Sequence, residues 1–226
     1  MKRTLALMLS FLLLISMVAC SPAATEAQKR KPSGTPAIAP STAYAVSLPM
    51  ADGVTNFVQF TMEGGATFVI ELYPEFAPKT VENFQHLVYA GFYNGLTFHR
   101  IVKDFILQGG DPNGDGSGAS PMKIPGEFPD NEFTQNTLTH ERGVVSMFRS
   151  TDKNSASCQF FITHQTARTL DGKYAAFGRV VAGMETIDAI AALEVEAQPI
   201  SGEVSRPINA PVIASAYFVN FTAPAV

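Results

Sequence analysis

Hydrophobic and polar side chains alternate in two neighbouring segments of the chain. These segments are residues 57–62 and 66–73, and Glu63-Gly64-Gly65 separates them. A period of two is typical of β-strands, and paired glycines between two such runs are typical of a tight turn. The pattern therefore predicts a β-hairpin. One face of its second strand carries Phe68, Ile70 and Leu72.

In two other segments the apolar period is close to 3.6 residues. Residues 79–90 carry an apolar stripe that stops at Gly91, and residues 184–193 carry a second stripe. Both predict amphipathic helices. The remaining apolar runs are short, which predicts strands at residues 97–103, 105–108, 144–148, 159–163, 176–180 and 211–221. Many strands with one early and one late helix favour a mainly β fold, a closed antiparallel barrel capped at its ends.

Residues 97–111 hold the polar side chains that carry most information. On simple alternation, Arg100 shares a strand face with Phe98 and Val102. An unpaired guanidinium is costly to bury, so Arg100 is expected either to line a cleft or to be a surface ion-pair partner. An amide follows at Gln108, before paired glycines that are expected to end the second strand. Polar groups beside apolar ones are typical of a small recognition site.

The start of the chain differs in composition from the rest. A basic beginning, a short apolar run and a small residue before Cys20 are typical of a secretory signal. The run is too short for a spanning helix, which needs about 20 residues. Met17-Val18-Ala19-Cys20 is similar to a bacterial lipobox, so residues 1–19 are expected to be cleaved and Cys20 to be lipidated. An ordinary secretory signal with an incidental cysteine is the alternative.

A tether and one domain are expected after the signal. Residues 20–48 are rich in Ala, Pro, Ser and Thr and show no apolar period, which predicts a flexible tether. Residues 49–226 are long enough for a single domain with its own core. A lipidated Cys20 would hold this domain outside the cytoplasm, on the bacterial cell membrane or envelope. Without the lipid, the protein would be secreted or periplasmic.

Charge and possible ligands limit the function classes. The net charge is −4, which argues against nucleic acid as a partner. Cys158 lies in an apolar run and is expected to be a small buried hydrophobe. His140-Glu141 shows no ligand spacing with the other histidines, so it is interpreted as a surface turn and no metal site is expected. Residues 109–121 match the first half of an EF-hand, but Met122 stands where its glutamate would be, so a calcium-binding surface protein is only a third hypothesis.

Two longer motifs resemble a known family. Phe98-His99-Arg100-Ile101, followed by Phe105-Ile106-Leu107-Gln108-Gly109-Gly110-Asp111, resembles the signature block of the cyclophilin family of peptidyl-prolyl cis-trans isomerases. Gln159-Phe160-Phe161 follows in the family's order, and the resemblance spans residues 57–221. It implies a closed antiparallel eight-stranded β-barrel capped by two α-helices. It also implies an enzyme that rotates X–Pro peptide bonds without a cofactor.

The resemblance also implies roles for individual residues. Arg100 and Gln108 are expected to be catalytic, with Arg100 stabilising the twisted amide and Gln108 holding Arg100 or the substrate carbonyl. The implied partners are proline-containing peptides and unfolded exported proteins, and the protein is expected to act as a monomer. The implied substrate-binding residues are Phe105, Ile106, Phe148, Gln159, Phe161, Leu170 and Tyr174.

Some positions depart from the family pattern. Ile106 replaces a methionine, and Phe148-Arg149 stands where alanine followed by asparagine or arginine is usual. Thr169 replaces the tryptophan linked to cyclosporin binding, and Tyr174 replaces a histidine. Catalysis is therefore expected to be retained and cyclosporin binding to be weak or absent. Because Phe148 could crowd the site, a proline-peptide binding module without catalysis is the alternative function.

Overall fold

The computed structural model describes residues 55–222. The predicted signal segment (1–19), Cys20 and the predicted tether (20–48) lie outside the described residues. Within them, the first hairpin forms as the alternation predicts. Strand β1 (Phe57–Met62) pairs antiparallel with β2 (Thr67–Leu72), so that Phe60 faces Phe68 and their rings stack 4.9 Å apart. Gly64 and Gly65 turn the chain between them with φ of +100° and +90°, a conformation that costs glycine little.

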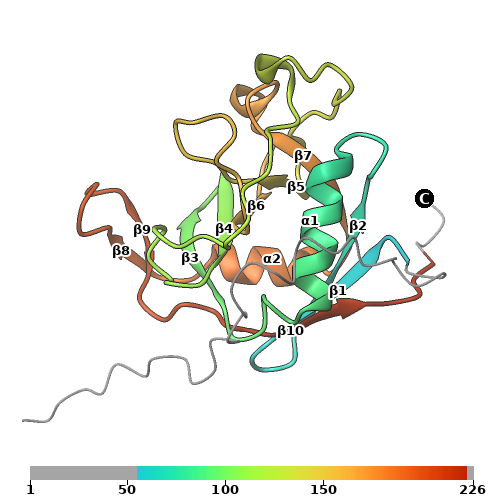
Figure 1. Cartoon of the computed structure of the whole chain (residues 1–226). Helices are drawn as coiled ribbons and strands as arrows, with labels where there is room; N and C mark the ends of the chain where they lie inside the picture. Colours follow the sequence, from blue (N-terminus) through green and yellow to red (C-terminus); the bar gives the residue numbers. More distant parts are fainter. Residues whose placement is uncertain (1–54, 223–226) are drawn as a thin grey trace, which may run out of the picture. The chain divides into compact units, whose positions relative to one another are not determined.

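Eight strands form one antiparallel sheet, which curls around the core (Figure 1). Their order in space is β10-β1-β2-β7-β5-β6-β4-β3. The other six strands are β3 (Thr97–Val102), β4 (Ile106–Asp111), β5 (Val144–Met147), β6 (Phe160–Thr163), β7 (Ala175–Ala182) and β10 (Ile213–Phe218). The strands lie close to their predicted positions. The fold is mainly β, as predicted.

The prediction of a closed barrel is wrong, because the sheet is an open, curled half-barrel. Its edge strands β3 and β10 are joined by one isolated bridge, Thr97 to Val212, and by a few backbone hydrogen bonds beside it. Pro211 lies at this junction and accepts a hydrogen bond from Phe98, but it has no N–H to donate. The pairing between the two edges therefore lacks a hydrogen bond at this position.

A second, two-stranded sheet was not predicted. It consists of β8 (Val195–Ala197) and β9 (Val204–Pro207), and β9 lies beside the edge strand β3 (Figure 1). Both strands are short and contain a charged residue, and β9 also contains a proline, so periodicity in the sequence does not reveal them. This β8–β9 hairpin covers the edge of the main sheet and brings new side chains next to Arg100.

Strand β4 is longer than predicted. The paired glycines were expected to end it, but it continues through them to Asp111. At Gly110, where φ is +80°, a Cβ would stand 2.7 Å from the carbonyl oxygen of Cys158. Only glycine allows the neighbouring chain to approach so closely, so here the glycine permits the pairing instead of ending it.

Both predicted helices form and pack on the sheet. Helix α1 (Pro78–Tyr89) packs against β7 and β10, and α2 (Met184–Ala191) packs against β2 and β3. Between α1 and the sheet lies a cluster of aromatic rings with Phe160 near its centre. The rings within contact distance of Phe160 are Phe60, Phe84, Tyr93 and Phe98.

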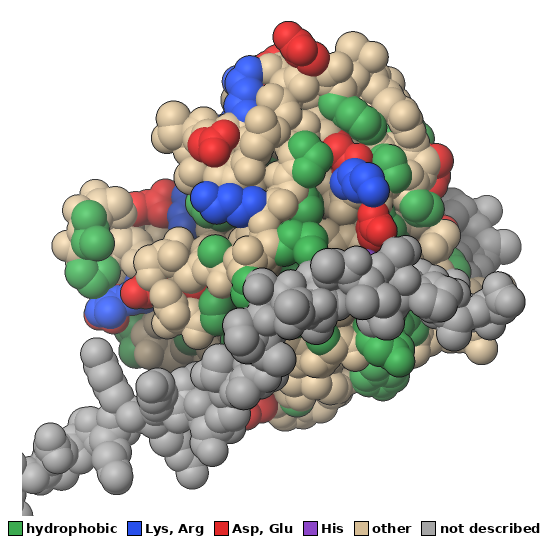
Figure 2. All heavy atoms as spheres, viewed as in Figure 1, with side chains coloured by type: hydrophobic (Ala, Val, Ile, Leu, Met, Phe, Trp, Pro, Cys, Tyr) green, Lys and Arg blue, Asp and Glu red, His purple; other side chains and the backbone are tan. Residues whose placement is uncertain are grey.

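The surface contributes much less to stability than this core. On the face shown in Figure 2, acidic, basic and hydrophobic side chains are interspersed. Exposed ion pairs such as Lys79–Glu82 and Arg206–Glu196 are typically worth about 0.2–1 kcal/mol each. Burying one phenylalanine side chain is worth about 1.5–3 kcal/mol.

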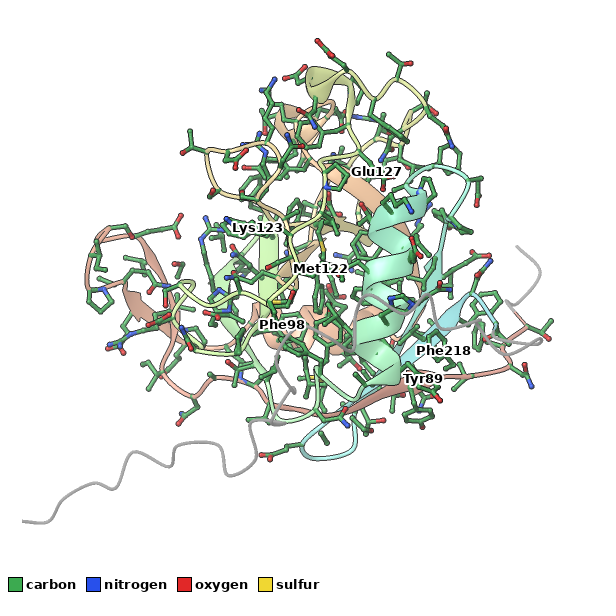
Figure 3. All side chains as sticks on the ribbon, viewed as in Figure 1. Tyr89, Phe98, Met122, Lys123, Glu127 and Phe218 are labelled. Atoms are coloured by element: carbon green, nitrogen blue, oxygen red, sulfur yellow. The ribbon has the colours of Figure 1, made fainter. Side chains whose placement is uncertain are left out.

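A buried carboxylate from a distant loop caps α1. The oxygens of Glu127 accept hydrogen bonds from the backbone N–H groups of Lys79 (3.0 Å) and Thr80 (2.8 Å). Figure 3 shows Glu127 at the N-terminal end of α1, with Tyr89 at the other end. The carboxylate satisfies N–H groups that have no partner within the helix, and its charge is favourable at this end of the helix dipole. Helix α1 is thus held to the loop before β5.

Candidate functional site

A β-bulge at His99 decides which side chains of β3 face outwards. Phe98 pairs with Gly109, and Arg100 pairs with the adjacent Gln108, so at this point β3 has one residue more than β4. Such a bulge reverses the alternation of the strand. Phe98 and Ile101 consequently lie in the core, while Arg100 is partly exposed on the opposite face. The prediction that Phe98 and Arg100 share a face is therefore wrong.

The register then aligns four side chains across the outer face of the sheet. Arg100 on β3 is opposite Gln108 on β4, Gln108 is opposite Phe161 on β6, and Phe161 is opposite Ser146 on β5. Directly paired residues of antiparallel strands project from the same face. We call these four residues the outer-face row. It places an arginine, an amide and an aromatic ring side by side.

A chain of amide hydrogen bonds joins the row to the glycine-rich loop. Gln108 Nε2 donates to Gln159 Oε1 (2.9 Å), and Gln159 Nε2 donates to the carbonyl oxygens of Gly116 (3.1 Å) and Gly118 (2.7 Å). The amide of Gln159 is therefore saturated within the protein. Among the described residues, Oε1 of Gln108 has no such partner, so it can accept a hydrogen bond from Arg100 or from a ligand.

The loop itself is tied down by Asp111. This carboxylate accepts backbone hydrogen bonds from Asn113, Asp115 and Gly116. Its oxygens thus satisfy the loop's own N–H groups, which removes the first ligand of the calcium-loop hypothesis. Within residues 55–222, no group of three or more His, Cys, Asp or Glu side chains is placed to hold a metal ion.

Aromatic contacts fix the ring of Phe161 from two sides. Tyr174 meets it edge-on at 5.5 Å, and the ring of His140 stacks on it at 5.9 Å. Tyr174 is itself covered by the guanidinium of Arg149, which lies 4.8 Å from the ring centre and donates to the carbonyl oxygen of Lys173. Arg149 thus holds Tyr174 in place, a role that the sequence did not indicate.

Ser146, His140 and Asp171 have the hydrogen-bond geometry of a hydrolase triad. His140 Nδ1 lies 2.9 Å from Asp171 Oδ1, and His140 Nε2 lies 3.0 Å from Ser146 Oγ. A carboxylate can only accept, so Nδ1 carries the proton and Nε2 accepts from the serine hydroxyl. Burial lowers the pKa of His140, which favours this neutral imidazole.

The same three residues cannot act as a triad, because no substrate can reach the hydroxyl. Ser146 and His140 are both 0% exposed. An attacking serine must be within reach of a substrate carbonyl and of an oxyanion site. The network instead joins the loop at Asp171 to β5, and the ring of His140 stacks on the ring of Phe161. The interpretation of His140 as part of a surface turn is therefore wrong, because its conformation depends on partners 6 and 31 residues away.

Arg100 forms a bidentate ion pair with Glu203, the residue just before β9. Arg100 Nε lies 2.6 Å from Glu203 Oε2, and Arg100 Nη2 lies 2.7 Å from Glu203 Oε1. The hydrogen bonds from Arg100 hold the pKa of Glu203 below its ordinary value. The expected ion-pair partner of Arg100 is thus present, and the expectation that Arg100 lines a cleft stays a prediction.

Of the other residues implied by the resemblance, Phe105 and Ile106 lie at the start of β4, and Leu170 lies in a separate helical turn. Phe105 is half-buried in the turn before β4. His164 anchors this turn: its ring nitrogen Nδ1 accepts a hydrogen bond from the backbone N–H of Asp104 (2.9 Å), and its backbone N–H donates to the carbonyl oxygen of Phe105 (2.9 Å). Ile106 follows on β4, buried but outside the main core cluster. Leu170 ends the 3₁₀ helix η2 (Arg168–Leu170) and directly precedes Asp171.

Phe148 stands apart from the aromatic cluster. It is half-buried directly after β5, and its N–H donates to the carbonyl oxygen of Gln159 (2.9 Å). Among the described residues, its ring makes no ring–ring contact, unlike Phe161. Its backbone is therefore fixed next to Gln159, and its side chain is partly exposed.

The remaining cysteine of the described chain is not suited to nucleophilic chemistry. Cys158 is buried, and burial raises the pKa of its thiol to about 11. The thiolate is the reactive form, so this residue acts as a small hydrophobe, as predicted.

Within residues 55–222, no helix has both the length and the apolar character that membrane crossing requires.

The fold and the outer-face row together define a class of protein. A curled eight-stranded sheet with two packed helices is the fold that this chain shares with solved cyclophilins. A family model described as cyclophilin-type peptidyl-prolyl cis-trans isomerase matches residues 57–217. The chain belongs to this family.

Relatives with assigned activity agree with this placement. The chain is 44% identical to peptidyl-prolyl cis-trans isomerase B of Bacillus subtilis over 126 residues, which cover 56% of this chain and 84% of the relative. It is 41% identical to human peptidyl-prolyl cis-trans isomerase-like 3 over 140 residues, covering 62% and 82%. These likenesses support the predicted peptidyl-prolyl isomerase activity.

Solved cyclophilin structures share the fold. A Cryptosporidium parvum cyclophilin-type isomerase, crystallised in the presence of the dipeptide Ala-Pro, aligns with a TM-score of 0.63 and 29% identity, covering 73% of this chain and 99% of that one. The cyclophilin AquaCyp293 from Hirschia baltica aligns with a TM-score of 0.58 and 27% identity, covering 75% and 76%.

Proposed function

We propose that Arg100 catalyses rotation about X–Pro bonds by donating a hydrogen bond to the nitrogen of the twisted amide. Rotation has a barrier of about 18–20 kcal/mol because the amide loses conjugation, and it takes tens to hundreds of seconds without a catalyst. Twisting localises a lone pair on the nitrogen. A donor directed at that lone pair is useful only in the transition state, which is the condition for catalysis.

The outer-face row is the observation that carries this proposal. It aligns Arg100, Gln108 and Phe161 on three neighbouring strands, through strand register and not through flexible loops. Phe105, Ile106, Phe161 and Leu170 supply apolar surface for the proline ring, and Gln108 Oε1 is open to accept a hydrogen bond. The substrates are proline-containing peptides, such as the Ala-Pro with which the Cryptosporidium relative was crystallised. Arg100→Ala, treated in the Discussion, tests the mechanism.

Phe148 bears on which sequences are accepted. Its half-buried ring follows β5 next to Gln159, where the family usually has a small alanine. The ring would contact the residue that precedes proline. A set of peptides that differ only at this position would measure the preference, and a folded protein that binds them without accelerating rotation would be a binding module instead.

Cyclosporin is expected to inhibit weakly or not at all. Thr169 is exposed on η2 at the position of the family's tryptophan, and a threonine offers little apolar surface to a large cyclic ligand. We expect less than half-maximal inhibition at micromolar cyclosporin in a peptide isomerisation assay. Thr169→Trp is the matched variant and should bind more tightly. Nanomolar inhibition of the unmodified protein would contradict this prediction.

We also propose that the protein is a lipid-anchored, monomeric folding catalyst for exported proteins. The lipobox-like Met17-Val18-Ala19-Cys20 and the following tether support this location. Replacing Cys20 by serine is expected to abolish incorporation of a radiolabelled fatty acid and to move the protein from the membrane fraction to the soluble fraction. A Cys158→Ser variant is the control and should stay membrane-bound. Equal labelling of the Cys20→Ser variant would contradict the anchor.

A further inference from the structure

We infer that Glu203 is a positioning residue of the isomerase site, because it holds the guanidinium of Arg100 in the orientation needed for catalysis. This inference rests on the proposed role of Arg100. Glu203 reaches the site from the β8–β9 hairpin, which is far from Arg100 in the sequence and includes none of the four strands of the outer-face row. The following observations carry it.

The geometry of the ion pair leaves three N–H groups of the Arg100 guanidinium available for other acceptors. Glu203 binds one edge of the guanidinium, through Nε and Nη2, at 2.6 and 2.7 Å. A guanidinium has five N–H donors in a rigid plane, so this contact uses two of them. Three donors remain, on Nη1 and Nη2, for Gln108 and a substrate. A side-on, two-point contact also prevents the plane from rotating, which a single hydrogen bond would not do.

Glu203 is itself held in place by the hairpin. Its carbonyl oxygen accepts a hydrogen bond from Gln198 N (2.7 Å), and Gly202 N donates to Gln198 O (3.0 Å), which closes the turn. The two strands are further joined by the Glu196–Arg206 ion pair. Since β9 lies along β3, the carboxylate stands on a structured element beside the strand that carries Arg100 (Figure 1). A site is most effective when its supporting residues are rigid in this way.

An alternative interpretation is that the pair only stabilises the hairpin. The Arg100 and Glu203 side chains are 25% and 40% exposed, and ion pairs at such sites contribute little to stability. The two interpretations differ in what they predict. A stabilising contact alone would leave kcat unchanged when it is removed, whereas a positioning contact would lower kcat.

The experiment compares two single-residue variants of the full-length chain. In Glu203→Gln the bidentate carboxylate is lost; in Glu196→Gln the same chemical change is made in an ion pair of the same hairpin that does not touch Arg100. We expect Glu203→Gln to lower kcat roughly tenfold with KM nearly unchanged, since misplacing a catalytic group by about 1 Å can cost up to about 100-fold. Glu196→Gln should keep the original kcat, and both variants should keep the melting temperature.

A double variant shows whether Glu203 acts through Arg100. In the Arg100→Ala background, adding Glu203→Gln should cause no further loss, because the group that Glu203 positions is gone. The Nε–H resonance of Arg100, recorded by NMR with ¹⁵N-labelled arginine, should shift and broaden in Glu203→Gln and stay unchanged in Glu196→Gln. This spectroscopic signal reports the guanidinium directly and does not depend on activity.

Several outcomes would overturn the inference. They are an unchanged or increased kcat in Glu203→Gln, an equal loss in Glu196→Gln, or a further loss on adding Glu203→Gln to Arg100→Ala. These results leave the proposed function intact as long as Arg100→Ala alone is impaired. If Arg100→Ala keeps full activity, the proposed mechanism fails first, and the two failures are therefore distinguishable.

Discussion

Arg100→Ala is expected to lower kcat/KM by about 10²- to 10³-fold, the usual cost of removing one preorganised donor to transition-state charge. The loss should appear mainly in kcat, because the interaction forms only with the twisted amide. The fold should survive. Arg100 is partly exposed, and the Glu203 carboxylate that loses its partner is 40% exposed, so water can solvate it. The measurement is a peptide isomerisation assay with a melting curve for each protein.

Arg206→Ala is the matched control for this experiment. Arg206 forms a single ion pair with Glu196 on the β8–β9 hairpin and lies outside the outer-face row. Its replacement removes the same side chain close to the site and should leave kcat/KM within about twofold, as expected for an exposed pair away from the chemistry. Full activity of Arg100→Ala would mean that Arg100 is only an ion-pair partner. A comparable loss in Arg206→Ala would point to damage to the hairpin.

Phe160→Ala and Phe161→Ala are expected to have opposite effects, although the two residues are adjacent. Phe160 is 0% exposed and lies near the centre of the aromatic core, so its truncation should lower the free energy of unfolding by about 3–5 kcal/mol. Phe161 is also buried, at 2% exposed, but it projects from the other face of β6 and lies outside the main core cluster, with its ring in contact with those of Tyr174 and His140. Its truncation should lower kcat/KM about 10- to 100-fold, since a phenylalanine contact is worth about 1.5–3 kcal/mol.

Urea denaturation and the isomerisation assay together test this contrast. Phe160→Ala should shift the urea midpoint strongly and keep most of its activity per folded molecule. The reverse pattern is expected for Phe161→Ala, with a smaller shift in the midpoint. A loss of activity that only reflects unfolding would follow the folded fraction, so the activity of Phe161→Ala would recover as the protein refolds at low temperature. That result would show that Phe161 does not belong to the site.

Much of the candidate site could be predicted because its residues lie in two long motifs. Arg100, Gln108 and Phe161 were identified by their resemblance to the cyclophilin signature, and the strand register then placed them side by side. Composition alone would have assigned Phe161 to the core with Phe160. The difference between them is only one of strand face, which becomes visible when the pairing partner is known.

Other parts of the site had no local signal. The bulge at His99 depends on how β3 pairs with β4, and simple alternation therefore put Phe98 and Arg100 on the same face. His140 is buried because its partners Ser146 and Asp171 come from other segments. An ion pair between positions 103 residues apart, such as Arg100–Glu203, leaves no trace in either segment.

The first hairpin, both helices, nearly all strands of the main sheet and the family of the chain could all be predicted from the amino-acid sequence. These features depend on neighbouring residues, since periodicity, turn glycines and motifs are all local. Three features are visible only in the tertiary structure. The sheet stays open, the β8–β9 hairpin covers its edge, and Glu203 forms a bidentate ion pair with Arg100. Each of these features depends on backbone groups and charges that are far apart in the sequence. They meet only after the chain has folded, and the local pattern of either segment does not reveal such contacts.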